Sequence, residues 1–185
     1  MSNHKSMPTT PAPFREDFDL LITFLNAPAD DRTAAIIFTA YAEKYLGELV
    51  QFRLPGLNSG LRKKLFDPSG MLGPLSAKID LAKALGQLDN TLFENIKVLA
   101  SIRNQFAHNL AIHSCDHPEI AKRIANFRGP FVKASSPEAQ RIADAEHAQK
   151  SNREKMSITA LGICLSLYNA HNAVAQIKRK GDAKD

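Results

Sequence analysis

The chain has no tryptophan, only 7% aromatic residues and only two cysteines. Two cysteines are too few for a disulfide-rich protein. Cys115 and Cys164 lie far apart and no signal peptide is evident, which predicts reduced thiols in a cytoplasmic protein. The most apolar window, residues 158–168, is too short to cross a bilayer. We therefore expect neither a secreted scaffold nor a membrane protein.

The sequence also lacks the signals of common catalytic and cofactor sites. No glycine-rich phosphate loop follows a strand pattern, and no Gly-x-Ser-x-Gly nucleophile turn occurs. The spacing of His113, Cys115, Asp116 and His117 matches no recurrent zinc pattern, and we interpret these residues as part of a loop. We expect no metal and no cofactor.

The residues that are abundant favour helices. Alanine, leucine, isoleucine and lysine are common, and 44% of the 185 residues are hydrophobic, which predicts one all-α domain of six or seven helices. We expect this domain to span residues 14–180, after a disordered polar arm at 1–13 and before a short tail at 181–185. The net charge of +5 is mild for a DNA-binding protein, and much of the excess lies near the chain ends.

Apolar periodicity at helical spacing divides the domain into elements. The expected helices are 14–25, 32–53, 61–66, 75–85, 90–112, 117–127 and 138–180. The residues that fit N-caps and stops are Asp30 or Asp31, Asp89 with Asn90, Ser136 and Gly86. We expect the 90–112 helix to pack on the 32–53 helix, with the C-terminal helix closing the core.

The expected 90–112 helix carries an arginine within its apolar stripe. Arg103 falls between Leu99 and Phe106 on this stripe, and a guanidinium cannot lose its charge, so its burial would require acceptors. Its own helix turn offers no carboxylate. Glu48, at the edge of the stripe of the 32–53 helix, is the predicted partner in a structural ion pair with Arg103.

A helix-turn-helix is one interpretation of residues 81–86 and the helix that follows, because leucine, alanine and glycine have the spacing of its turn. A recognition helix needs exposed basic residues near its start. Here the start carries Asp89 and Glu94, which repel phosphates. Direct DNA binding is therefore not expected.

The run Arg103-Asn104-Gln105-Phe106-Ala107-His108 resembles the signature of the HEPN superfamily, helical domains with a metal-independent ribonuclease site. The resemblance implies that Arg103, Asn104 and His108 would cleave RNA. The imidazole would move a proton while the guanidinium stabilised charge on the phosphate. Arg103 and His108 project to different faces of one helix, and the sites of this superfamily are typically built by both chains of a dimer. In the structural alternative, Arg103 anchors the helix and His108 ends it.

A longer stretch is similar to the mannitol operon repressor family (MltR type). The residues that carry this similarity are Leu65–Asp67, Gly70, Leu72–Ile79, Leu81, Ala84–Gly86, Ile102–Asn104 and Phe106–His108. It implies an all-helical regulator of mannitol uptake and use, in a family without an evident DNA-binding motif. Such a regulator acts through a protein partner, and a homodimer is compatible with it.

The loop at 67–74 has two interpretations. Amides at the start of the following helix can bind an anion, whereas glycine and proline at these positions also suit a tight structural turn. Our main prediction is a non-enzymatic regulator that resembles the mannitol repressor and works by protein association. The alternative is a dimeric, HEPN-like ribonuclease, and RNA is a partner only in that alternative.

Overall fold

The computed structural model describes residues 19–23, 30–129 and 135–182, with the side chains of 174–182 outside that description. Residues 19–23 are helical, and the other described elements are also α-helices, which confirms the all-α prediction. These helices are α2 (Asp31–Phe52), α3 (Ser59–Phe66), α4 (Leu75–Ala84), α5 (Asn90–His108), α6 (Pro118–Ile124), α7 (Pro137–Gln149) and α8 (Asn152–Asp182). The predicted arm at 1–13 and most of the predicted 14–25 helix lie outside the described residues, as does the end of the tail.

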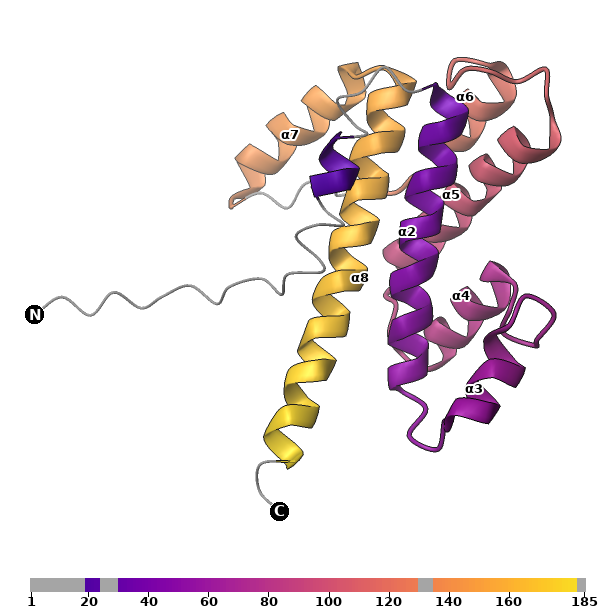
Figure 1. Cartoon of the computed structure of the whole chain (residues 1–185). Helices are drawn as coiled ribbons and strands as arrows, with labels where there is room; N and C mark the ends of the chain where they lie inside the picture. Colours follow the sequence, from indigo (N-terminus) through magenta and orange to yellow (C-terminus); the bar gives the residue numbers. More distant parts are fainter. Residues whose placement is uncertain (1–18, 24–29, 130–134, 183–185) are drawn as a thin grey trace, which may run out of the picture.

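Two long helices, α2 and α8, lie side by side through the molecule (Figure 1). They run in the same direction, because Asp31 at the start of α2 pairs with Arg153 at the start of α8. α5 packs on both and runs antiparallel to α2, since Arg32 donates to the carbonyls of residues 109, 110 and 112 just after α5. α4 packs on α2 and α5, while α6 packs on α5 and α8.

The core lies where α2, α5 and α8 meet, as the sequence predicted. Its largest fully buried side chains include Phe38, Leu46 and Leu49 of α2, Ile96, Leu99, Ile102 and Phe106 of α5, and Met156 of α8. Burial of each such side chain contributes about 1.5 to 3 kcal/mol, so this three-helix junction is the main source of stability. In the described part of the chain, no helix has the length and apolarity to span a membrane.

Local capping explains where most helices begin and end. Asp30, Asp89 and Ser136 each accept a hydrogen bond from the backbone N–H three residues later, which confirms these N-cap predictions. α4 stops shortly before Gly86, whose φ of 68° lies in the left-handed region that favours glycine. The predicted stop is therefore also confirmed.

The expectation of one continuous helix over 138–180 is wrong, because α7 ends at Gln149 and α8 begins at Asn152. Ser151 and Glu154 form a capping box between them. The Glu154 carboxylate accepts from the Ser151 N–H at 2.9 Å, and the Glu154 N–H donates to the Ser151 Oγ at 3.3 Å. This reciprocal pair satisfies donors that a helix start leaves free. The Ser-x-x-Glu spacing was a sequence signal for the break.

Asp31 connects three segments at one end of the bundle. Its carboxylate accepts from the Cys115 N–H at 2.6 Å and pairs with Arg153 of α8. Burial raises the pKa of Asp31, but the Cys115 N–H and the Arg153 guanidinium outweigh burial, so this pKa lies below its usual value. The ionised carboxylate thus joins α2, α8 and the loop after α5.

Both cysteines are free and buried, in line with the predicted reduced thiols. Burial raises the pKa of Cys164 to about 12, and burial with the nearby Asp31 carboxylate raises the pKa of Cys115 as well. Since the thiolate is the reactive form, these thiols act as small apolar core residues.

Candidate functional site

The buried face of α5 differs from the predicted stripe. Asn95 and Ile102 are buried, whereas Arg103 is only partly buried. Leu110 is 75% exposed because α5 ends at His108 and the chain leaves the helix at Asn109. The stripe is shifted because α5 is covered by α2 and α8 and also by α6. Arg103 therefore lies at the edge of the packed face.

The predicted ion pair between Arg103 and Glu48 is not formed. The Glu48 carboxylate instead lies 3.9 Å from the His171 Nε2 of α8. Arg103 and Glu48 both lie in the C-terminal halves of their helices, and α2 and α5 are antiparallel, so the two residues are at opposite ends of the contact. The antiparallel orientation could not be read from the periodicity of either helix alone.

Lys78 of α4 forms an ion pair with Glu43 of α2. Its Nζ lies 2.6 Å from the Glu43 Oε1 and 3.0 Å from the carbonyl of Gly73, and Lys78 is only 9% exposed. This pair was not predicted from the sequence, although Lys78 falls three residues after Leu75 and so on the buried side of its helix. The pair joins α4 to α2 and fixes the start of α4.

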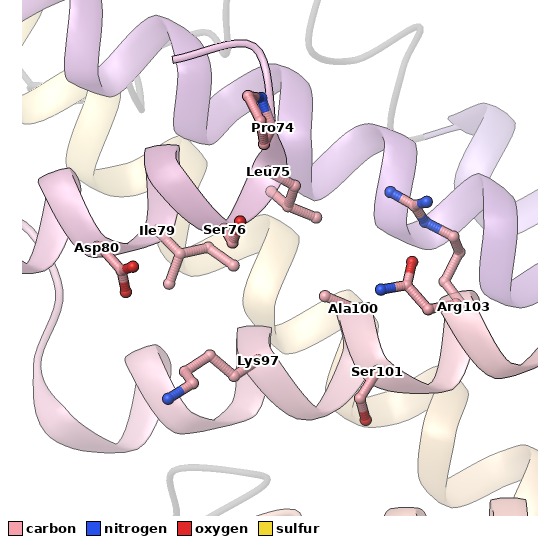
Figure 2. Close-up of a pocket in the computed structure, with 10 residues that line it drawn as sticks. Pro74, Leu75, Ser76, Ile79, Asp80, Lys97, Ala100, Ser101 and Arg103 are labelled. Atoms are coloured by element: carbon pink, nitrogen blue, oxygen red, sulfur yellow. The ribbon is translucent and has the colours of Figure 1, made fainter. Parts of the chain in front are cut away.

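A cavity of about 520 Å³ lies between α4 and α5 (Figure 2). We call it the α4–α5 cavity. Its polar side chains are Ser76 and Asp80 of α4 and Lys97, Ser101, Arg103 and Asn104 of α5. Its apolar side chains are Pro74, Leu75, Ile79 and Ala100. Two of the three residues of the hypothetical ribonuclease site, Arg103 and Asn104, thus line one cavity.

The charged groups of the cavity are separated. Figure 2 shows Arg103 at one end, and Asp80 and Lys97 toward the other. The Lys97 Nζ lies 4.8 Å from the centroid of the Phe93 ring, a cation–π contact. Among the residues that the structure describes, the Arg103 guanidinium has no hydrogen-bond or ion-pair partner. One end of the cavity therefore offers five unused N–H donors.

His108 does not share this cavity. It is the last residue of α5 and is exposed, while Asn104 is exposed and lines the cavity beside Arg103. Within one chain, the structure therefore groups Arg103 with Asn104 and leaves His108 outside, as the angular separation along one helix predicted.

The loop at 67–74 pairs its own amides. The Gly70 N–H donates to the Asp67 carbonyl at 2.7 Å, and the Gly73 N–H donates to the Gly70 carbonyl at 3.0 Å. A Cβ at Gly70 would lie 2.5 Å from the Leu65 carbonyl, and one at Gly73 would lie 2.4 Å from the Asp67 carbonyl. These two amides are used within the loop, so the loop itself is a structural turn, whereas the amides at the start of α4 are a separate group.

Two further sites, a DNA-reading helix-turn-helix and a metal site, were not expected from the sequence. The second helix of the suspected helix-turn-helix, α5, buries Ile96, Leu99, Ile102 and Phe106 in the core, so its inner face is not free to enter a DNA groove. Over the described residues, no group of three or more histidine, cysteine, aspartate or glutamate side chains is arranged to hold a metal ion.

Comparison with known proteins supports the fold. A chain in the X-ray structure of the MtlR–HPr complex from Escherichia coli matches this chain with a TM-score of 0.60 and 16% sequence identity. The match covers 83% of this chain and 99% of the other. No protein-family model and no curated protein matches. At this identity the match shows a shared all-helical fold of the MtlR type.

Proposed function

We propose that this chain is a regulator of the mannitol-repressor type that acts by binding a partner protein of the HPr type. The observation that carries the proposal is the fold match, which covers nearly the whole of a chain from the MtlR–HPr complex. The resemblance of the motifs between residues 65 and 108 to the mannitol operon repressor family agrees with this fold match, while no family model matches the chain. The role is non-enzymatic, since partner binding needs only a complementary surface.

The surface best suited to a partner is α3 with the loop after it. α3 buries none of its residues, and Leu61 (42% exposed) and Met71 (79% exposed) are large apolar side chains in solvent. The loop folds back on the last turn of α3, because the Leu72 N–H donates to the Leu65 carbonyl at 2.8 Å. The exposed cations beside Leu61 are Arg62, Lys63 and Lys64. Apolar centres with a charged rim are typical of transient interfaces.

Titration calorimetry of the full chain with purified HPr tests this proposal. We expect saturable binding that the double substitution Leu61→Asp and Met71→Asp weakens at least about tenfold, a loss of about 1.4 kcal/mol. The matched control is Ile142→Asp on α7, which places the same acid on another exposed isoleucine (57% exposed). Absence of binding to HPr would contradict the partner, and equal losses in both variants would contradict the surface.

The ribonuclease is the second candidate, and one observation favours it. Arg103 is partly exposed and has no partner among the described residues, so its guanidinium is free to contact a phosphate. Cleavage would need His108 from a second chain, because His108 lies outside the α4–α5 cavity of its own chain. Incubation with single-stranded RNA in chelator, beside His108→Ala, tests this candidate. Cleavage that the substitution abolishes would replace the regulator as first choice.

A further inference from the structure

We propose that the α4–α5 cavity binds a small organic phosphate, with Arg103 as the residue that holds the phosphate. Its volume of about 520 Å³ falls within the range of about 300 to 1,000 Å³ typical of small-molecule sites. Its walls combine apolar side chains from Leu75, Ile79 and Ala100 with a few polar groups. This composition is typical of sites that orient a small ligand.

The phosphate end is defined by Arg103. A guanidinium presents a rigid fork of donors that matches two oxygens of a phosphate. The only carboxylate in the cavity lining, Asp80, lies toward the opposite end (Figure 2), so it does not compete for this guanidinium. Asn104, on the same stretch of α5, adds an amide, whereas the Ser101 hydroxyl donates to the Val98 carbonyl of its own helix. This end of the cavity therefore carries several N–H donors and no carboxylate that could accept from them.

The first turn of α4 adds donors to the same cavity. α4 begins at Leu75 after Pro74, which supplies no side-chain cap, and its first helical N–H bond is from Lys78 to the Pro74 carbonyl. The N–H groups of residues 75–77 therefore have no intrahelical acceptor. Since Pro74, Leu75 and Ser76 line the cavity beside Arg103, a phosphate would meet donors from both helices.

The other end of the cavity favours a ligand with hydroxyl groups. Asp80 and Lys97 lie there, and they can accept from and donate to the same polar body. The lining offers two cations and one anion within a single, partly open cavity, without an extended basic track for a polynucleotide. The favoured occupant is thus compact and carries one phosphate.

Phosphorus NMR line broadening and calorimetry on the full chain test the proposal, with inorganic phosphate and glycerol 3-phosphate as probes. We expect both to bind, and the ester to bind more tightly because the walls cover its carbon body. Arg103→Gln should weaken both at least about tenfold. Arg141→Gln, the same exchange at an exposed position of α7 far from this cavity, should change neither.

Two further variants keep the result decisive. Ala100→Leu adds bulk to the cavity wall without changing charge, and it should weaken the ester more than inorganic phosphate. His113→Gln should leave both affinities unchanged, because His113 is exposed and lies outside the lining. Thermal unfolding checks that every variant is folded. Absence of binding, equal affinity of Arg103→Gln and wild type, or loss of binding in His113→Gln would each overturn the proposal.

Discussion

Lys78 and Arg103 are two cations on neighbouring helices, and the protein uses them differently. Lys78 is buried and its ammonium contacts a carboxylate and a carbonyl, whereas Arg103 is partly exposed and contacts neither kind of acceptor among the described residues. A buried charge without a partner costs several kcal/mol, so the satisfied cation is part of the framework. The unsatisfied cation beside a cavity is available for a ligand.

This difference shows that an ionisable residue in an apolar stripe is not by itself evidence of an internal ion pair. Arg103 has a long stem, and a long stem can cover apolar surface while the charged head reaches solvent. Lys78 is less conspicuous in the sequence, yet it faces the interior because α4 packs on both α2 and α5. The position of the neighbouring helices decides which charge is enclosed.

The largest expected effect comes from removing Glu43, the partly exposed partner of the buried Lys78. Glu43→Ala should lower the free energy of unfolding by about 2 to 3 kcal/mol, because it leaves a buried ammonium with one carbonyl acceptor. Urea denaturation measures this loss. Glu146→Ala, at an exposed position of α7, should change stability by less than about 0.5 kcal/mol. Equal effects in the two variants would contradict the framework role of the pair.

Asp31, like Lys78, is a charged residue whose hydrogen-bond and ion-pair partners lie within the protein. Asp31→Asn should cost about 1 to 2 kcal/mol at pH 7, since hydrogen bonds to a charged group are lost. The pKa of Asp31 is lower in the folded protein, so its contribution is present above the unfolded value of about 3.9 and is lost as pH falls below it. The free energies of unfolding of Asp31→Asn and of the wild type, measured by denaturation, should therefore converge in acid. Asp19→Asn, which is exposed, should show no such convergence.

The capping box between α7 and α8 has a smaller expected effect. Ser151→Ala should cost about 1 kcal/mol, because it removes the Oγ acceptor for the Glu154 N–H at the start of α8. Thermal unfolding measures the shift. Ser69→Ala, at an exposed loop position, should leave the melting temperature unchanged. A similar shift in both variants would show that the box contributes nothing specific.

Arg103→Ala is expected to have the smallest effect on stability, a loss of less than about 1 kcal/mol, because no paired group is stranded. The same substitution should remove phosphate binding to the α4–α5 cavity. Chemical denaturation beside the phosphate titration separates the two effects. A stability loss as large as that of Glu43→Ala would show that Arg103 belongs to the framework after all.

The sequence alone determined the helical class, most helix positions and the caps at Asp30, Asp89 and Ser136, because these depend on interactions within a few residues of chain. It also singled out Arg103 and Asn104 as unusual residues. The Ser151–Glu154 capping box also depends on interactions between neighbouring residues, and it could have been predicted from the Ser-x-x-Glu spacing. Without it, one helix was expected where α7 and α8 are separate.

Only the tertiary structure decided which charges meet. The pairs Lys78–Glu43 and Asp31–Arg153 join segments far apart in the sequence, and so does Asn95, which donates to and accepts from the backbone of Arg128. Whether Arg103 meets Glu48 or lines a cavity depends on the direction in which α5 crosses α2. The periodicity of a helix fixes which residues share a face, but the other helices that pack there determine what that face contacts.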